Sequence, residues 1–326
     1  YAFAALKSDG SVVTWGDSGY GGYSSAVAAL LSSGVTQIFS NYYAFAALKA
    51  DGSVVTWGNG DYGGYGLGTA GQLSSGVTQI FSTVNAFAAL KADGSVVTWG
   101  SSNHGGDSSA VAAQLSSGVT QIFSNQAAFA ALKADGSVVT WGGSNYGGDS
   151  ITVAAQLSSG VTQIFSSSYA FAALKSDGSV VTWGDSSYGG NSSAVAAQLS
   201  SGVTQIFSND QAFAALKSDG SVVSWGNSGY GGDSSTVAHQ LVNVVGMADI
   251  STDDWYSPAP VPTNTPPSLA APSAPTFTDT PSDDTFAPAS GTLLGNDPDP
   301  GTTLAYGISG GTVSSGVSTR VGTYGT

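Results

Sequence analysis

Short apolar segments separated by Gly, Ser and Asp recur along residues 1–252. The segment AFAALK occupies residues 2–7 and SVVTW occupies residues 11–15, and each has the length of a short strand. A third segment of this kind, VTQIFS, occupies residues 35–40. An Asp-Gly pair joins the first two segments and favours a tight hairpin, because it tolerates positive φ at both turn positions. The pattern therefore predicts a unit of three antiparallel β-strands.

This unit repeats with a constant spacing of 42 residues. Its Phe recurs at Phe3, Phe45, Phe87, Phe129, Phe171 and Phe213. Its Trp recurs at Trp15, Trp57, Trp99, Trp141, Trp183 and Trp225. Periods of about 40 residues with three or four strands per unit are typical of β-propellers. A helical solenoid is disfavoured because Gly, Ser, Thr and Val dominate every unit, and a β-solenoid usually has a shorter repeat.

The long segment between each Trp and the next VTQIFS is rich in Gly and Ser, as at residues 183–202. We expect a loop there, with either one short turn of helix or a fourth strand over its AVAAQL sequence. The six Trp end the third strand at a fixed place, so we expect their large rings to fill the wedge between neighbouring blades.

The two ends of the repeat region predict how the ring closes. The chain starts at the second strand of a unit, and VAHQLVNVVGMADIS after the sixth Trp is a degenerate copy of VAAQLSSGVTQIFS. We expect residues 244–250 to pair with residues 1–7 as the missing first strand, since a closed ring has no exposed sheet edge. Trp255 lies 42 residues after Phe213 and is interpreted as the trace of a seventh unit.

The repeat resembles the RCC1 type. The resemblance is carried by V-x-x-I followed by F-A-x-L-K-x-D-G-x-V-x-x-W-G-x-x-x-x-G, and it covers about 250 of the 326 residues. It implies an all-β, RCC1-like β-propeller over residues 1–255, which is six-bladed or a fragment of a seven-bladed ring. The family includes a secreted bacterial β-lactamase inhibitor and a eukaryotic nucleotide exchange factor that binds chromatin. The family's G-Q-L-G stretch is altered here to sequences such as that of residues 105–108, GGDS.

The composition changes after residue 255. Residues 256–276 are Pro-rich, which predicts a stiff, extended linker. Residues 277–326 include FTDTPSDDTFAPASGTLLGNDPDPGTTLAYGISGGT, which resembles the start of a VCBS or cadherin-like β-sandwich of large bacterial surface proteins. The resemblance implies a truncated β-sandwich segment. We expect the sequence to be part of a longer protein, because it begins inside one repeat and stops inside this segment.

Charge and composition exclude several functions. The net charge is −14, with seven basic residues and 21 acidic residues, all of them Asp. Such a surface repels phosphate backbones and anionic membranes, so we expect neither nucleic-acid binding nor membrane insertion. The chain has no Cys, which excludes disulfides and thiolate metal sites.

Aromatic residues in the Gly-rich loops are the candidate binding residues. They occupy one position of the repeat, at Tyr20, Tyr62, His104, Tyr146, Tyr188 and Tyr230. One interpretation is an aromatic circle that stacks on sugars or anchors a protein. The other interpretation is that these rings cover the seams between blades. The six Lys of AFAALK form a second equivalent set, and we expect each to pair weakly with the Asp of its own Asp-Gly turn.

The sequence NDPDP is the candidate metal site. Asn296, Asp297 and Asp299 supply clustered oxygen atoms, which suit Ca²⁺, with Asp279, Asp283 or Asp284 as further ligands. The alternative is an acidic, Pro-rich turn. No other cofactor is expected.

No catalytic residues are expected, because near-identical blades do not favour one asymmetric site. The best hypothesis is a non-catalytic binding, adhesion or structural module of a large bacterial surface protein, located extracellularly or at the cell surface. Its partners would be a protein or glycan on a cell or matrix surface. One alternative is a secreted inhibitor that binds another protein, like the bacterial relative. The other alternative is a self-assembling fibre subunit, since head-to-tail contacts that do not close give filaments.

Overall fold

The computed structural model describes residues 1–65 and 71–247, together with four short strands of the later sequence. These are β18 (Ser268–Leu269), β19 (Gly295–Asn296), β20 (Thr312–Ser314) and β21 (Val317–Thr319). The chain divides into two compact units, Tyr1–Pro258 and Ala259–Thr326. In the second unit β18 pairs antiparallel with β19, and β20 pairs with β21. Most of the predicted linker and most of residues 277–326 lie outside the described residues, as does Trp255.

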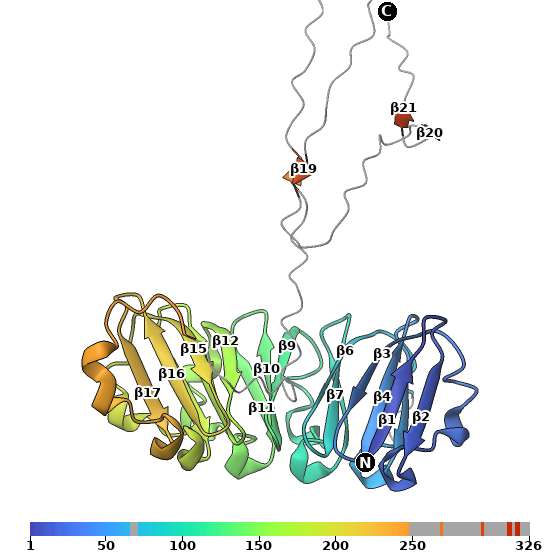
Figure 1. The fold of residues 1–326 in the computed structure, drawn as a ribbon, viewed down its shortest axis with the longest axis horizontal. Coiled ribbons are helices and arrows are strands. Elements are labelled where there is room, and N and C mark those ends of the chain that lie inside the picture. Colours follow the sequence, from blue (N-terminus) through green and yellow to red (C-terminus); the bar gives the residue numbers. More distant parts are fainter. Residues whose placement is uncertain (66–70, 248–267, 270–294, 297–311, 315–316, 320–326) are drawn as a thin grey trace, which may run out of the picture. The chain divides into compact units, whose positions relative to one another are not determined.

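The first unit is built from six successive antiparallel sheets, numbered here as blades 1 to 6 in chain order (Figure 1). The central strands are β1 (Ala2–Leu6), β4 (Ala44–Lys49), β7 (Ala86–Lys91), β10 (Ala128–Lys133), β13 (Ala170–Lys175) and β16 (Ala212–Lys217). The strands that follow them are β2 (Val12–Gly16), β5 (Val54–Gly58), β8 (Val96–Gly100), β11 (Val138–Gly142), β14 (Val180–Gly184) and β17 (Val222–Gly226). The strands that precede them in blades 2 to 6 are β3 (Val35–Ser40), β6 (Val77–Ser82), β9 (Val119–Ser124), β12 (Val161–Ser166) and β15 (Val203–Ser208). These bounds confirm the predicted three-stranded unit in five of the six blades.

The Gly-rich segments contain short 3₁₀ turns, and no fourth strand is found in their described residues. One series of turns carries the candidate aromatic residues: η1 (Ser18–Tyr20), η3 (Gly60–Tyr62), η4 (Ser102–His104), η6 (Ser144–Tyr146), η9 (Ser186–Tyr188) and η11 (Ser228–Tyr230). The second series leads into the next blade: η2 (Ser25–Val27), η5 (Ser109–Val111), η7 (Ile151–Val153), η8 (Gln156–Ser158), η10 (Ser193–Val195) and η12 (Ser235–Gln240). The helical turn is therefore the correct alternative for AVAAQL.

The hairpin turns differ from the prediction in one respect. Gly10 takes a φ of 76°, but Asp9 does not take a positive φ, and Asn243 is the only non-Gly residue that does among the described residues. The reason is local, because the Asp9 carboxylate accepts hydrogen bonds from both the amide and the hydroxyl of Ser11. The same two bonds recur in each later turn, as at Asp135 and Ser137.

These turns make the fold sensitive to acid. The Ser11 hydroxyl and amide, followed by Lys7, lower the pKa of Asp9 from 3.8 to about 2, and the equivalent Ser lowers the pKa of Asp135. A carboxylate with a lowered pKa stabilises the folded state above its ordinary pKa, and this contribution is lost as the pH falls through the folded value. We expect the urea midpoint of the wild-type chain to fall between pH 3.8 and about pH 2.

Two serine variants test the cause of this acid sensitivity. Ser137→Ala removes one hydroxyl donor to Asp135, so its urea midpoint should depend less on pH in this range. Ser158→Ala is the matched control, because the Ser158 hydroxyl donates to the Ala155 carbonyl and not to a carboxylate. A wild-type midpoint that stays constant down to about pH 2 would contradict this account.

Neighbouring blades pack through one repeated contact. Each blade presents a Phe and a Trp from its central and third strands, as with Phe129 and Trp141, whose ring centroids lie 5.2 Å apart. The Gly that follows the 3₁₀ turn of the preceding blade covers this pair. A Cβ added at Gly105 would lie 2.5 Å from Phe129 Cδ2, and Trp141 Nε1 donates to the Gly105 carbonyl at 3.1 Å. Only Gly fits this close approach, which holds blade 3 against blade 4.

The same contact recurs between the other blades. Trp57, Trp183 and Trp225 donate to the carbonyls of Gly21, Gly147 and Gly189 respectively. Trp99 differs, because its buried Nε1 has no hydrogen-bond partner within the described residues. The predicted core role of the Trp is confirmed for the five Trp of blades 2 to 6, which are at most 5% exposed.

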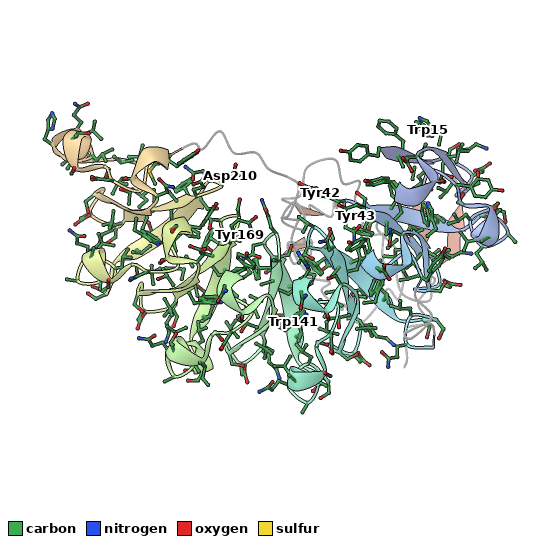
Figure 2. The ribbon with its side chains drawn as sticks, turned by 90° about the horizontal axis from the view of Figure 1, so that it is seen from below. Trp15, Tyr42, Tyr43, Trp141, Tyr169 and Asp210 are labelled. Atoms are coloured by element: carbon green, nitrogen blue, oxygen red, sulfur yellow. The ribbon has the colours of Figure 1, made fainter. Side chains whose placement is uncertain are left out.

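A second set of bonds joins the blades along one side. Tyr42 N donates to the Val84 carbonyl, and Val84 N donates in turn to the Gln126 carbonyl. The series continues from Gln126 N to the Ser168 carbonyl and from Ser168 N to the Asp210 carbonyl, with all four hydrogen bonds at 2.9–3.1 Å. Figure 2 shows the blades following one another along an arc, with Tyr42, Tyr169 and Asp210 on its inner side. This inner row of backbone bonds fixes the spacing of successive blades.

The predicted closure of the ring is not found in the described residues. β1 pairs with β2 alone, so blade 1 has two strands. Val244 N donates instead to the Gly220 carbonyl of blade 6 at 2.9 Å, as Val203 N donates to Gly178 O one blade earlier. The register of the preceding repeats therefore continues into residues 241–247 and carries them along blade 6. Residues 248–250 lie outside the described residues.

Candidate functional site

The candidate site is the row of aromatic residues that the first series of 3₁₀ turns presents. Each turn begins after a Trp-Gly pair and ends in a Gly with a left-handed backbone, such as Gly147 with a φ of 94°. The ring therefore stands at the last position of the turn, as at Tyr146. Each aromatic residue of the predicted set occupies this position: Tyr20, Tyr62, His104, Tyr146, Tyr188 and Tyr230.

A polar residue ties the turn to the body of its blade in blades 2 to 6, and three of these five residues, Thr83, Asn125 and Ser167, are buried. Asn125 Nδ2 donates to the Tyr146 carbonyl at 2.7 Å, and its Oδ1 accepts from the amides of Ala127 and Ala128. Thr83 and Ser167 make the equivalent bond to the carbonyls of His104 and Tyr188. Asn125 is 1% exposed, and a buried polar group that bonds at both ends holds its neighbours rigidly.

The anchoring role of these residues was not predicted from the sequence. They occupy one position of the repeat, and their identity alternates among Asn, Thr and Ser: Asn41, Thr83, Asn125, Ser167 and Asn209. Their common property is a short side chain that bonds backbone groups. That property, rather than residue identity, is the signal that would have identified them.

The structure stacks the loop tyrosines on a second set that sequence reasoning also missed. Tyr1, Tyr43 and Tyr169 directly precede their central strands. Tyr20 stacks on Tyr43 of the next blade with ring centroids 5.1 Å apart, and Tyr43 stacks on Tyr62 of its own blade at 4.4 Å. Contacts within a blade thus alternate with contacts between blades.

The stacked rings form two groups, which we call the tyrosine ladders. The first ladder, on blades 1 and 2, consists of Tyr1, Tyr20, Tyr43 and Tyr62. The second, on blades 4 and 5, consists of Tyr146, Tyr169 and Tyr188, which meet in a tilted and an edge-to-face contact with centroids 4.6 and 4.7 Å apart. The position of Tyr43 is held by Asn85, Ala127 and Gln211 in other blades, and this variation explains why the second set was not recognised.

Blade 3 replaces the tyrosine pair with a hydrogen-bonded pair. Asn85 Nδ2 and His104 Nε2 lie 3.2 Å apart, and His104 Nδ1 lies 3.2 Å from the Ser101 hydroxyl. Partial burial lowers the pKa of His104, so its imidazole is neutral at pH 7. The two ladders are therefore separated by an uncharged polar pair.

The ladders are suited to contact with a partner. Their rings are partly exposed, from Tyr1, which is 90% exposed, to Tyr146, which is 37% exposed, and the remaining rings are half-buried. Desolvation, followed by the neighbouring tyrosines, raises the pKa of Tyr20 and of Tyr169, so both phenols remain protonated and able to donate at neutral pH. In the first ladder, stacking by Tyr20 and Tyr62 covers the faces of the Tyr43 ring. The rings lie at seams between blades, as one predicted interpretation has it, and the binding interpretation stays a prediction.

Three segments of the chain match the model of the "Regulator of chromosome condensation (RCC1) repeat", at residues 35–63, 161–189 and 203–231. These three segments are RCC1-like repeats. The matched segments begin at the first strand of a blade and end at the Gly after the tyrosine turn, so the RCC1 repeat includes both the hairpins and the ladder positions. No curated protein matches the sequence.

Solved structures with similar folds are distant in sequence. The ectodomain of the Physcomitrella patens receptor kinase CR4 is 16% identical over 69% of this chain and 60% of that chain, with a TM-score of 0.39. The structure of Kap60 bound to yeast RCC1 (Prp20) is 18% identical over 59% of this chain and 56% of that chain, with a TM-score of 0.38. Human WBSCR16 is 20% identical over 59% of this chain and 61% of that chain, with a TM-score of 0.37. The chain thus spans about 60% of the length of these proteins.

The Lys side chains of the repeats make different contacts from the predicted pairs with the Asp of their own turn. Lys7 alone forms the predicted pair among the described residues, with Asp9 Oδ2 at 3.1 Å. In the later blades the ammonium group donates to a carbonyl 19 residues upstream, as Lys133 does to Gln114 at 2.9 Å. The preceding loop supplies this acceptor, and blade 1 has no preceding loop in this sequence. These Lys therefore join a loop to its next blade.

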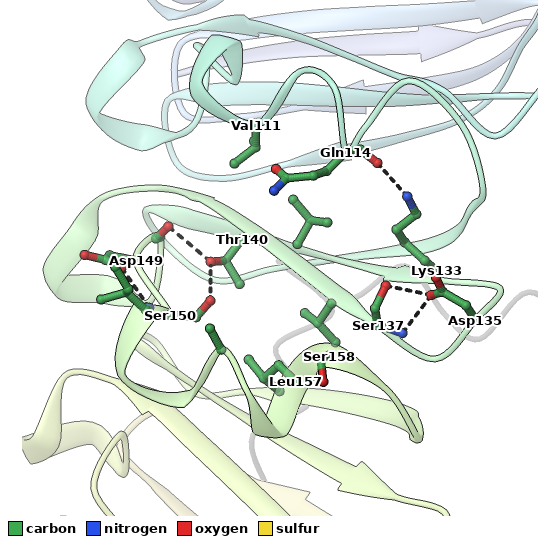
Figure 3. Close-up of a pocket in the computed structure, with 15 residues that line it drawn as sticks. Val111, Gln114, Lys133, Asp135, Ser137, Thr140, Asp149, Ser150, Leu157 and Ser158 are labelled. Atoms are coloured by element: carbon green, nitrogen blue, oxygen red, sulfur yellow. Dashed lines mark hydrogen bonds between the residues drawn. The ribbon is translucent and has the colours of Figure 1, made fainter.

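Two hollows lie at equivalent places in successive blades. One pocket of about 600 Å³ lies at blade 4, and another of about 540 Å³ lies one blade further on (Figure 3). In the first pocket Lys133 bonds to Gln114 and Asp135 bonds to Ser137, while the Thr140 hydroxyl donates to Ser150. The polar side chains are thus engaged with one another, as expected for structural turns.

The calcium prediction falls on residues that the structure does not describe. Asp297 and Asp299 lie outside the described residues, and only the strand position of Asn296, in β19, is given. Within the described part of the chain, no group of three or more His or Asp side chains is placed to hold a metal ion. The described residues also include no helix with the length and apolar character needed to cross a bilayer.

Proposed function

We propose that the RCC1 repeats form a non-catalytic, protein-binding module, with the tyrosine ladders as its contact surface. The observation that carries this proposal is the ring contacts of partly exposed tyrosines, three of whose turns are anchored by hydrogen bonds from Asn41, Asn125 and Ser167. Tyrosines held rigidly lose little conformational freedom on binding, and tyrosine is enriched among the residues that dominate interface energies.

The stacking geometry favours a protein over a glycan as the partner. A sugar stacks on a free aromatic face, but in the first ladder the faces of Tyr43 are covered by Tyr20 and Tyr62. The exposed edges and phenol hydroxyls suit the mixed apolar and polar surface of a protein. A net charge of −14 further favours a partner with a basic or neutral contact surface.

We further propose that the module acts in adhesion, at the surface of a bacterial cell. The support is the combination, in one acidic and Cys-free chain, of RCC1 repeats, a Pro-rich segment and a segment resembling the start of a VCBS repeat. Immunogold electron microscopy of producing cells tests the location. Label on the cell exterior is expected, and label confined to the cytosol would contradict this part of the proposal.

Binding to an immobilised panel of extracellular-matrix proteins and to a glycan array tests the contact surface. We expect binding to a protein of the panel, and a loss of more than about tenfold in affinity for Tyr43→Ala, which removes the ring between Tyr20 and Tyr62. Tyr23→Ala is the matched control, because Tyr23 is 70% exposed and belongs to neither ladder.

The outcomes separate the candidate functions. Equal loss for both tyrosine variants would rule out the ladders as the contact surface. Binding to glycans alone would contradict the protein partner. Capture of one stoichiometric protein from culture medium, with no matrix binding, would replace adhesion with the inhibitor alternative.

A further inference from the structure

The second tyrosine ladder brings three phenol rings together at the seam between blades 4 and 5. Tyr146 of blade 4 meets Tyr169 of blade 5 with ring centroids 4.6 Å apart and ring planes tilted by 39°. Tyr169 meets Tyr188 of its own blade at 4.7 Å, with the edge of one ring against the face of the other. Both blades lie inside the series, between blade 3 and blade 6.

Hydrogen bonds fix the backbone from which each of these rings projects. Asn125 Nδ2 donates to the Tyr146 carbonyl at 2.7 Å, and the Ser167 hydroxyl donates to the Tyr188 carbonyl at 2.8 Å. The Tyr169 carbonyl accepts from the backbone amide just before η9 at 2.9 Å. Groups of one molecule that are held in a suitable orientation react with effective molarities of up to about 10⁵–10⁸ M. A reaction between two of these rings is therefore strongly favoured over a reaction between chains.

The ladder rings are also accessible to a reagent in solution. Tyr146 is 37% exposed, and Tyr169 and Tyr188 are half-buried. The pair Tyr43 and Tyr62 in the first ladder has the same combination, with both rings half-buried and their centroids 4.4 Å apart. Accessible phenols in lasting contact are what oxidative coupling requires, because two short-lived phenoxyl radicals must meet. The chain has no Cys, so disulfides cannot cross-link it.

We propose that the tyrosine ladders are sites of dityrosine cross-linking, in which a bond between Tyr146 and Tyr169 joins blade 4 to blade 5. The oxidant is hydrogen peroxide, used by a haem peroxidase. Each phenol loses one electron and one proton, and the two radicals form a carbon–carbon bond between Cε atoms ortho to their hydroxyl groups. The hydrogen on each bonded Cε then moves to the phenolic oxygen, which restores the aromatic ring. The two electrons and two protons released reduce one hydrogen peroxide to two molecules of water.

The geometry of the ladders determines which tyrosines couple. Tyr169 lies between Tyr146 and Tyr188 and contacts both, so every cross-link of the second ladder includes Tyr169. Blade 3 carries His104 in place of the loop tyrosine, so no cross-link is expected between Tyr62 and Tyr146. A net charge of −14 keeps copies of the chain apart at low ionic strength, which further favours coupling within one chain.

The bond between Tyr146 and Tyr169 would act on stability as a disulfide does. It closes a loop of chain that runs from blade 4 into blade 5, and it restricts the unfolded chain. We expect the cross-linked protein to have a higher urea midpoint than the unmodified protein. The reaction needs no binding partner of the ladders, so its failure would leave the proposed contact with a protein unaffected.

Oxidation of the dilute 326-residue chain by hydrogen peroxide and a haem peroxidase at low ionic strength tests the proposal. We expect dityrosine fluorescence in the monomer fraction and an intact mass lowered by two hydrogen atoms for each cross-link. Chymotrypsin cleaves after Phe165 and so separates the two tyrosines of the inter-blade bond. Mass spectrometry of the digest should therefore detect a fragment pair joined through Tyr146 and Tyr169.

Two variants that keep the aromatic ring test the choice of tyrosines. Tyr169→Phe removes one phenol and should lower the yield of cross-links at the second ladder by more than about tenfold. The cross-link between Tyr43 and Tyr62 should keep its wild-type yield. Tyr23→Phe is the matched control, because Tyr23 is 70% exposed and makes no ring contact among the described residues. Its yields at both ladders should equal those of the wild type.

Oxidation in urea above the unfolding midpoint tests whether the folded geometry is responsible. The unfolded chain does not hold the rings together, so the bond between Tyr146 and Tyr169 should be lost there. An equal yield of this bond in the folded and unfolded chains would overturn the proposal. Dityrosine found only in dimers and larger species, or an equal loss for Tyr23→Phe and Tyr169→Phe, would overturn it as well.

Discussion

Phe129→Ala is expected to lower the free energy of unfolding by about 3–5 kcal/mol, the usual range for removing a fully buried Phe. Phe129 is 0% exposed and packs with Trp141 and the Gly105 turn of blade 3. Its loss leaves a cavity at the contact between two blades. Urea unfolding followed by Trp fluorescence measures the change.

The chain supplies its own control for this substitution. Phe3 occupies the same repeat position, makes the same ring contact with its Trp, and is 62% exposed. Phe3→Ala measured on the dilute chain should change the free energy of unfolding by less than about 1 kcal/mol. Equal losses for the two variants would show that the blade contact does not contribute to stability.

Gly147→Ala is expected to destabilise the chain by about 2–5 kcal/mol through two separable effects. A non-Gly residue with a left-handed backbone costs about 1–2 kcal/mol. The added Cβ would also lie 2.7 Å from Phe171 Cδ2, and overpacking of this kind costs about 1–3 kcal/mol. Thermal unfolding of the two proteins gives the total.

Gly231→Ala separates these two effects. Gly231 has a φ of 91°, close to the 94° of Gly147, but no ring lies above it. Its substitution therefore measures the backbone effect alone. We expect Gly147→Ala to be the more damaging by about 1–3 kcal/mol. Similar losses would mean that the preceding Gly is required for its backbone and not for its contact with the next blade.

Much of the fold follows from the sequence because one unit is repeated with constant spacing. The strand VTQIFS, the hairpin around Asp-Gly and the core position of the Trp were all predictable from local pattern. Each depends on residues close in sequence or on a position shared by all copies. Repetition gives every local inference several independent confirmations, such as the five buried Trp.

Features that depend on one particular neighbour were not predictable. The Lys of each blade was expected to bind its own Asp, but Lys133 reaches the Gln114 carbonyl of the preceding loop. Residues 244–250 were expected to pair with β1, but Val244 N donates to the Gly220 carbonyl of blade 6, and residues 248–250 lie outside the described residues. Both errors concern which blade lies beside a residue, and a 42-residue period does not contain that information.

Of the two sets of rings in the candidate site, only the loop ring could be predicted from the sequence, and the reason is related. The loop ring recurs as Tyr in five of six units, and recurrence made it visible. Its stacking partner is Tyr1, Tyr43 or Tyr169 in three units and a different residue in the others. A variable position becomes meaningful only when the structure places it between two rings, as Tyr43 lies between Tyr20 and Tyr62.

Hydrogen–deuterium exchange of the dilute 326-residue chain tests most directly the central claim that each blade is held by the blade before it. The amides of Ala128–Lys133, in a strand with blades on both faces, should exchange most slowly. Those of Ala2–Leu6, in the two-stranded blade with an uncovered aromatic face, should exchange much faster. Equal protection of these two strands in the monomer would contradict the account.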